Sequence, residues 1–171
     1  INTTALNTGT EDAVINGVDI GTGPGTGSNN TRVGDSALSS LTTGHSNTAL
    51  GHRSGESTTT QTLNSYVGAY AGLNAAGTEN TAVGYGALRS GSAASNNSSN
   101  TAIGSKSLYG ITTGDTNTAV GGAAGFSLTT GTSNTVVGYN AQASSATASH
   151  EITLGDNNTK SFRIPGSSFY I

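Results

Sequence analysis

The aliphatic residues of this chain recur within a short polar pattern and form no long apolar run. Each copy of the pattern reads Asn, a small hydroxyl residue, a variable residue that is most often Ala, an aliphatic residue and Gly, as in Asn47-Thr48-Ala49-Leu50-Gly51. Neighbouring residues of an extended segment point to opposite faces of a strand. The pattern therefore predicts a short β-strand in every copy, with an apolar residue on each face.

The copies follow one another at a nearly constant interval. The closing glycines lie at 34, 51, 68, 84, 104, 121, 138 and 155, which gives spacings of 17, 17, 16, 20, 17, 17 and 17 residues. A disordered linker has no reason to keep such a period, and 17 residues are too few for a helical repeat pair. We expect an all-β fold, a β-solenoid of about eight 17-residue rungs. The repeat-defining residues are Asn47, Gly51, Asn80, Gly84, Asn100, Gly104, Asn117, Gly121, Asn134 and Gly138.

The fixed Asn and Gly have physical roles in such a rung. Asn tolerates a left-handed backbone, and its amide can stack as a ladder on the rung below. Gly permits the tight corner after the strand. The longest interval, between Gly84 and Gly104, takes up the polar run 90–99, which we expect to form a surface loop. At a strand spacing of about 4.8 Å, eight rungs make a rod of roughly 40 Å.

The apolar content favours assembly over a self-contained core. Only 32% of the 171 residues are hydrophobic, and 26 are Gly. We expect Ala to fill the narrow interior of the coil, which leaves the neighbouring aliphatic residue on the outer face in need of cover from another chain. We therefore expect a homo-oligomer. The alternative is a monomer in which Val and Leu lie inside and Ala faces outward.

Composition also excludes several classes of protein. The absence of Cys excludes a disulfide framework and a Cys-ligated metal site. A formal net charge of −3 and a pI near 5.4 give no reason to expect a nucleic-acid partner. No apolar run approaches membrane-spanning length, so no membrane insertion is expected.

The two ends differ from the repeat, as solenoid arrays require. Residues 1–29 are expected to form an N-terminal lead-in with a tight turn at Asn16-Gly17 and a Gly-rich linker. That linker lacks the Lys-Ser/Thr of a phosphate-binding loop. Residues 30–155 form the solenoid, and 156–171 form a C-terminal cap or a join to a further domain.

The ionisable residues give no enzymatic prediction. The carboxylates are scattered over different rungs and turns, so we expect no enzyme, no catalytic residue, no cofactor and no metal site. His45 and His52 have only Asp35 or Glu56 as local co-ligands, and we interpret them as solvated turn residues. The run 156–158, Asp-Asn-Asn, is interpreted as a polar turn of the cap in preference to a calcium site.

A binding surface is a stronger prediction. The two residues after each closing Gly vary from copy to copy, and in a solenoid they stack into one stripe. Tyr and Arg are common anchors of binding surfaces. The alternative is that turns vary because nothing constrains them. The predicted receptor-facing stripe consists of Asp35, His52, Arg53, Tyr70, Tyr85, Lys106 and Tyr139.

The repeat resembles a known family. Units of the form NTAVGYGAL…TTG…NTAVG resemble the repeats of bacteriophage tail fibres and related virion appendages. The segments AVINGVDIGTGPGTGSNNTRVG and SHEITLGDNNTKSFRIPG resemble the start and end of such arrays in fibres of marine-type phages, so the match spans roughly residues 13–166. The heads of trimeric autotransporter adhesins are looser relatives.

The resemblance implies an elongated homotrimeric virion fibre that takes part in host attachment. Its partners would be copies of itself, other virion appendage proteins and a host surface glycan or protein. Such fibres often continue into a self-cleaving chaperone domain, which this sequence lacks. Three residues depart from the pattern, and we expect cap or loop-facing adaptations there: Arg32, Tyr66 and Glu151.

Three other functions stay open at this point. A non-viral extracellular or cell-surface adhesin or filament subunit would use the same fold. A purely structural spacer would bind no cell or glycan. An ice-binding solenoid would need a regular exposed Thr array on one strand, whereas we expect the threonines to lie mostly in Thr-Thr-Gly turns such as 42–44.

Overall fold

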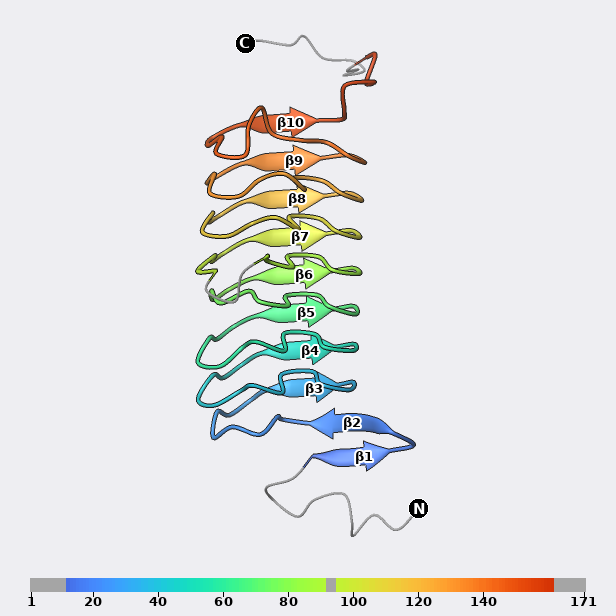
Figure 1. The fold of residues 1–171 in the computed structure, drawn as a ribbon, viewed down its shortest axis with the longest axis vertical. Coiled ribbons are helices and arrows are strands. Elements are labelled where there is room, and N and C mark those ends of the chain that lie inside the picture. Colours follow the sequence, from blue (N-terminus) through green and yellow to red (C-terminus); the bar gives the residue numbers. More distant parts are fainter. Residues whose placement is uncertain (1–11, 92–94, 162–171) are drawn as a thin grey trace, which may run out of the picture.

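The chain folds into a single ten-stranded sheet wound as a β-solenoid (Figure 1). The computed structural model describes residues 12–91 and 95–161. These residues contain no helix, and therefore none able to span a membrane. The strands follow chain order across the sheet: β1 (Ala13–Ile15), β2 (Val18–Gly21), β3 (Thr31–Val33), β4 (Thr48–Leu50), β5 (Ser65–Val67), β6 (Thr81–Val83), β7 (Thr101–Ile103), β8 (Thr118–Val120), β9 (Thr135–Val137) and β10 (Ile152–Leu154).

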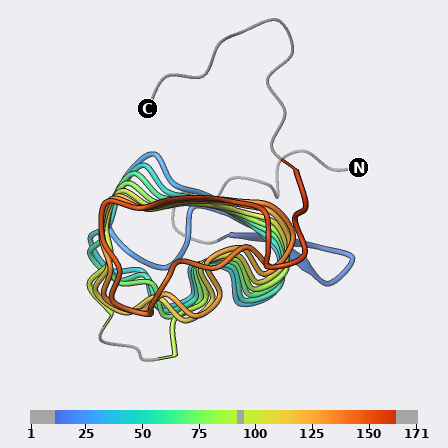
Figure 2. The same ribbon diagram turned by 90° about the horizontal axis from the view of Figure 1, so that it is seen from above.

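Strands β3 to β10 are parallel, and each coincides with one copy of the sequence motif. The all-β solenoid is therefore confirmed. It has about seven turns, one fewer than the eight rungs expected, because seven returns of the chain connect eight strands. Viewed from above, successive turns superimpose into one outline, and the β1–β2 hairpin projects from it (Figure 2).

Each parallel strand points its central residue inward and its two flanking residues outward. In β4, Ala49 is 1% exposed while Leu50 is 46% exposed, and Ala82, Ala102 and Ala119 are equally buried at the same register position. The prediction of Ala inside and an outward aliphatic neighbour is confirmed for one chain. The alternative, with Ala outward and the strand's Val or Leu inward, is wrong.

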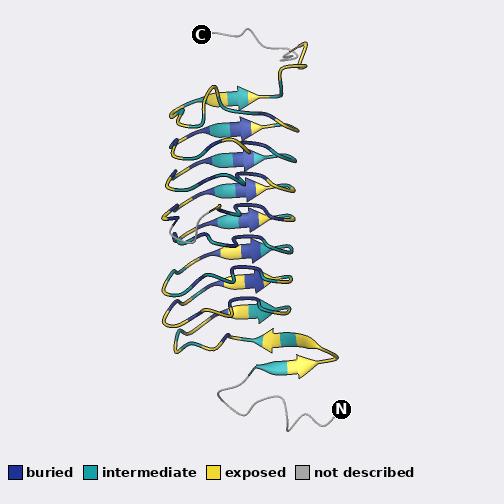
Figure 3. Cartoon of the chain, viewed as in Figure 1, coloured by how far each residue is buried: buried dark blue, intermediate teal, exposed yellow. Residues whose placement is uncertain are grey.

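The interior is filled from two sides. Small residues come from the strands and from the position three after each Gly, and larger aliphatic side chains come from the returning segment, such as Leu38, Leu108 and Ile111. The main cluster runs from Tyr66 to Ala141, and a smaller one lies around Leu38 near the first turn. The buried segments recur at the same place in successive turns (Figure 3).

The predicted Asn ladder is confirmed. Asn47 donates its backbone N–H (2.9 Å) and its side-chain Nδ2 (3.1 Å) to Oδ1 of Asn30 one turn below, and Nδ2 also donates to the Gln61 carbonyl. Every later Asn of the ladder up to Asn134 is buried and donates its backbone N–H to Oδ1 of the preceding Asn, and Nδ2 does the same at each of them except Asn80, where it donates to the Asn97 carbonyl. At the last turn only the backbone of Glu151 continues the ladder, while its carboxylate accepts hydrogen bonds from Ser144. This residue is the cap-side adaptation expected from the sequence.

The closing glycines have a steric role as well as a conformational one. Gly84 has φ +130°, and a Cβ built on it would lie 2.7 Å from the backbone carbonyl carbon and oxygen of Gly104 in the next turn. Any side chain there would push adjacent turns apart. The Gly of the motif is therefore required by the close stacking of backbones at this corner.

The N-terminal end is closed by an ion-pair cluster. Asn16 and Gly17 both have positive φ and form the turn of the β1–β2 hairpin, as predicted. Arg32 occupies the inward position that other strands give to Ala, pairs with Asp12 and Asp19, and donates Nη1 to the Ala37 carbonyl. Its side chain is only 12% exposed, so Arg32 forms a cap over the open end of the first turn.

Three further predicted segments have distinct outcomes. The Gly-rich run 21–27 lies against the first turn, where Thr26 N–H donates to the Thr42 carbonyl, so this part of the linker is packed. In the predicted loop 90–99, Ser95 forms a parallel bridge with Ala75 and Asn97 is buried, while 92–94 lie outside the described residues. Of the predicted cap 156–171, residues 162–171 also lie outside the described part.

Candidate functional site

The turn that follows each strand is built in the same way throughout the array. In the second turn, Ser54 N–H donates to the Gly51 carbonyl, and Arg53 adopts a left-handed φ of 55°. Tyr70 and Lys106 have the same conformation at the equivalent place. Each of these residues donates its N–H to the carbonyl of a residue one turn below, as Tyr70 does to His52 at 2.9 Å. The variable residue pairs are therefore stacked in one column along the solenoid.

Within this column the structure brings together four of the seven predicted stripe residues. The rings of His52 and Tyr70 meet edge to face at 5.3 Å between centroids, and Tyr70 meets Tyr85 in the same way at 5.8 Å. The guanidinium of Arg53 lies 5.7 Å from the Tyr70 centroid. Contacts of this geometry hold the rings in defined orientations.

A second column, missed by the sequence analysis, lies beside the first. It consists of the fifth residue after each closing Gly, including Arg89, Tyr109 and Phe126. The Arg89 guanidinium lies 5.4 Å from the Tyr70 centroid and 5.6 Å from that of Tyr109, and the Tyr109 and Phe126 rings stack in parallel at 5.2 Å. The signal for this column was present in the sequence, because the period of the repeat places these residues at equivalent positions.

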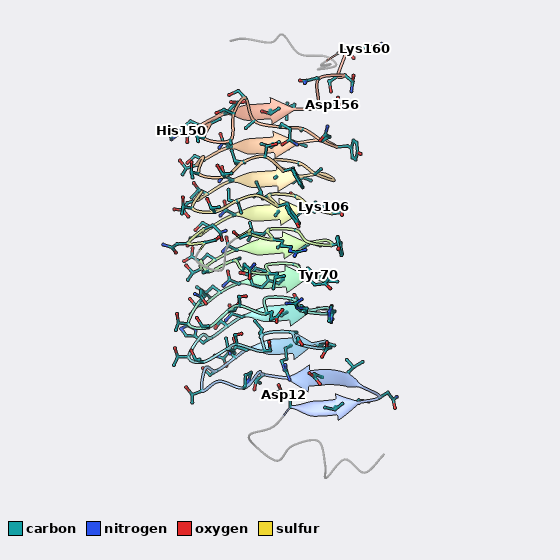
Figure 4. The ribbon with its side chains drawn as sticks, in the orientation of Figure 1. Asp12, Tyr70, Lys106, His150, Asp156 and Lys160 are labelled. Atoms are coloured by element: carbon teal, nitrogen blue, oxygen red, sulfur yellow. The ribbon has the colours of Figure 1, made fainter. Side chains whose placement is uncertain are left out.

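The two columns together form one surface feature, called here the aromatic–cation patch. It spans five successive turns at the corner that follows the strands, where Figure 4 labels Tyr70. The patch consists of His52, Arg53, Tyr70, Tyr85, Arg89, Tyr109 and Phe126.

The other predicted stripe residues lie around or beyond the patch. Asp35 is 3.0 Å from His52 Nδ1, at the N-terminal end of the column. Lys106 follows Tyr85 one turn further, through its N–H bond to the Tyr85 carbonyl. Tyr139 is 79% exposed, with its ring next to Gly122, and has no aromatic contact to the patch.

The charges of the patch are unevenly compensated. Glu56 pairs with Arg53, and this hydrogen-bonded ion pair raises the pKa of the guanidinium. Asp35 similarly faces His52. Arg89 and Lys106 have no carboxylate partner among the described residues. Arg89 within the patch and Lys106 next to it are therefore cations that no described carboxylate neutralises.

In the part of the chain that the structure describes, the other ionisable groups do not gather into a metal-binding cluster. His45 precedes β4 and His52 follows it, and within the described residues no three His, Cys, Asp or Glu side chains come close enough to hold a metal. The carboxylate of Asp156 accepts hydrogen bonds from the backbone and side chain of Asn158, which lower the Asp156 pKa. The segment 156–158 thus forms a polar turn, beside a cavity of about 340 Å³ lined in part by Gln142 and Leu154.

A second extended surface lies on the outer side of the sheet. The third residue of each parallel strand forms an aliphatic column whose members are half-buried or exposed, up to 46% for Leu50 and 47% for Leu154. The first residue forms a parallel column of Thr or Ser, with Ile152 at the end. We call these two columns the outward sheet face: Val33, Leu50, Val67, Val83, Ile103, Val120, Val137 and Leu154, with Thr31, Thr48, Ser65, Thr81, Thr101, Thr118, Thr135 and Ile152.

The Thr column corrects an expectation. The Thr-Thr-Gly turns at 42–44, 112–114 and 129–131 hold six threonines, and an equal number stand in register on the strands and point outward. The alternation of side chains places the small hydroxyl residue of the motif on the same face as its aliphatic residue.

No known protein family, characterised protein or solved structure that was compared with the chain matches it.

Proposed function

We propose that this chain is a structural segment of a homotrimeric bacteriophage fibre, a virion appendage that takes part in host-cell attachment and has no enzymatic role. The observation that carries the proposal is the outward sheet face. An aliphatic column with exposures near 40% at Val83 and Ile103 continues over all eight parallel strands. Continuous exposed apolar surface on a small protein is typical of an interaction site.

Copies of the same chain are the partners that this face fits best. The face carries no charged side chain, so identical chains meet without like-charge repulsion. Its columns repeat at every turn, so parallel copies can match turn for turn around a common axis and close as a ring. The number three and the virion location come from the resemblance of the repeats to phage fibres. Other appendage proteins would then join at the ends of the rod.

A charge placed in the aliphatic column tests this assembly. We expect Ile103→Lys to weaken self-association at least tenfold, because each trimer would bury three unpaired ammonium groups. Thr113→Lys introduces the same charge at an exposed turn and serves as the matched control. Sedimentation velocity over a range of concentrations measures the assembled fraction. If the Ile103→Lys trimer were as stable as that of the control, the sheet face would not be the interface.

A non-viral extracellular adhesin or filament subunit would use the same trimeric rod, and the binding and assembly tests do not separate it from a phage fibre. Recovery of the chain from purified virions distinguishes the two functions. Its presence there, in stoichiometric amount, is the expected result, and its confinement to a cell surface would favour the alternative.

The Thr column favours one further candidate, an ice-binding solenoid. Thr48, Thr101 and their equivalents present hydroxyl and methyl groups at regular strand spacing, next to the aliphatic column. Ice binding needs this face to be open to solvent, whereas the fibre needs it to be covered. Thermal hysteresis of the purified chain separates them: its absence is expected, and a measurable gap between melting and freezing points would favour ice binding.

A further inference from the structure

We propose that the aromatic–cation patch binds an acidic saccharide, a sugar that carries a carboxylate, sulfate or phosphate group. This inference deepens the attachment role proposed above by naming the ligand class and its site. It does not depend on trimeric assembly, because the patch lies within a single chain.

The aromatic residues provide ready-made surfaces for sugar rings. Tyr85 is 49% exposed and Phe126 is 41% exposed, so both have ring area open to a ligand. Each is held in place by a neighbouring ring, Tyr85 by Tyr70 and Phe126 by Tyr109. Rigid amphipathic rings give contact area at low entropic cost, and this ladder extends along the axis as a linear glycan would.

Arg89 makes the patch selective for negative charge. Its guanidinium lies between the rings of Tyr70 and Tyr109, which fix its position without neutralising it. A guanidinium stacked on rings keeps N–H donors at its edge, in the fork geometry that matches a carboxylate or sulfate. Arg53 is already paired with Glu56, so Arg89 is the cation available to a ligand.

Lys106 adds a second cation one turn beyond Tyr85. Figure 4 shows Lys106 and Tyr70 on the same edge of the solenoid, at the turns after the strands. The whole chain has a net charge of −3, so two uncompensated cations beside four aromatic rings form a local exception to the overall charge. A neutral glycan would need the rings alone and would leave these cations unused.

The patch also lies apart from the outward sheet face. Its residues belong to the turns that follow the strands, whereas the aliphatic and Thr columns belong to the strands themselves. Saccharide binding and chain assembly therefore use different residues, and their tests can be read separately.

A glycan array tests the proposal. The probes are immobilised uronic-acid, sulfated and phosphorylated oligosaccharides, each next to its neutral parent sugar. We expect the unmodified chain to bind one or more acidic sugars at least tenfold more strongly than their neutral parents. The binding should weaken as ionic strength rises, because the attraction between exposed charges is screened by salt.

Variants then assign the binding to the patch. Arg89→Gln and Tyr85→Ala should each reduce binding to the best acidic probe at least tenfold, and Lys106→Gln at least threefold. Tyr139→Ala is the matched control, because Tyr139 has the turn position of Tyr85 and lies outside the patch. Circular dichroism confirms that each variant keeps its strands.

The outcomes separate this proposal from the previous one. Absence of acidic-sugar binding, equal binding to the neutral parents, or an equal loss with Tyr139→Ala would overturn the acidic-saccharide site. If a chain that failed these binding tests were still trimeric, the proposal of a trimeric fibre would hold and only the saccharide site would be rejected. If the chain were monomeric but bound acidic sugars through Arg89, the saccharide site would hold and the trimeric fibre would be rejected.

Discussion

At the residue scale, Tyr66 shows how the interior adapts to one large side chain. Its ring is fully buried at a position where four of the eight parallel strands have Ala, which corrects the expectation of a cap or loop-facing residue. The ring fits because Gly55 and Gly72 stand at the position where turns such as those of Leu38 and Leu88 have Leu, and a Cβ on either glycine would collide with the ring. Burial raises the pKa of the Tyr66 hydroxyl.

This fit makes a prediction for Gly72→Ala. The added Cβ would lie well inside contact distance of the Tyr66 ring, at a left-handed φ of +63°, so we expect a loss of about 3 kcal/mol or more in the free energy of unfolding. With Tyr66→Ala also present, only the backbone strain of about 1–2 kcal/mol should remain. Urea denaturation of both single variants and the double variant measures the coupling.

The control for this cycle is Gly91→Ala, since nothing lies within 4 Å of a Cβ built there and its φ is not left-handed. Its stability should match the unmodified protein within about 0.5 kcal/mol. Equal costs of Gly72→Ala with and without the Tyr66 ring would show that the ring does not require this glycine.

At the scale of the element, each turn is joined to the next by backbone hydrogen bonds and by the Asn ladder. Asn117 Oδ1 accepts from both the N–H and Nδ2 of Asn134, while its own Nδ2 donates to Asn100 and to the Gly131 carbonyl. All of these groups are buried, so their hydrogen bonds cannot be replaced by water.

We therefore expect Asn117→Ala to destabilise the protein by about 2–4 kcal/mol, because it leaves the N–H of Asn134 and the Gly131 carbonyl without their partner. Asn157→Ala, at an exposed turn, should change stability by less than about 0.5 kcal/mol. Chemical denaturation at one fixed chain concentration measures both. Similar values for the two variants would contradict a stabilising role of the ladder.

The elements that the sequence predicted are those set by the period. The spacing of Asn and Gly located every parallel strand, and Asn16-Gly17 located the hairpin turn. The cap around Arg32 was not predictable in detail, because its partners Asp12 and Asp19 are brought to it by antiparallel pairing that no periodic signal encodes. The left-handed conformation of the turn residues was also not predicted, because Leu38 and Leu108 adopt it at positions where Gly would be expected.

The candidate site was predicted in part. The turn column with His52 and Tyr70 follows from stacking equivalent positions of the repeat. The second column also occupies an equivalent position of the repeat, but its contact with the first column was not predictable. The path of the chain after the turn brings Arg89 beside Tyr70, and that path depends on left-handed residues such as Leu88.

At the scale of the whole molecule, the solenoid presents two chemically different surfaces. The outward sheet face is uncharged and has an aliphatic column along its length, and the turns beside it carry aromatic rings and cations. On the proposed account, the first surface joins three copies into a rod, and the second meets the host. Because the narrow interior is filled largely by Ala and Leu, the same account proposes that covering the sheet face adds to the stability of the rod.

The most direct test of this account is the mass of the unmodified chain in solution, measured by light scattering after size exclusion. A trimer predicts three times the chain mass of 16.8 kDa, about 50 kDa, and this value should persist on dilution until the sheet faces separate. A folded, stable species of 16.8 kDa at all concentrations would contradict the central claim, because the aliphatic column would then be stable in contact with water.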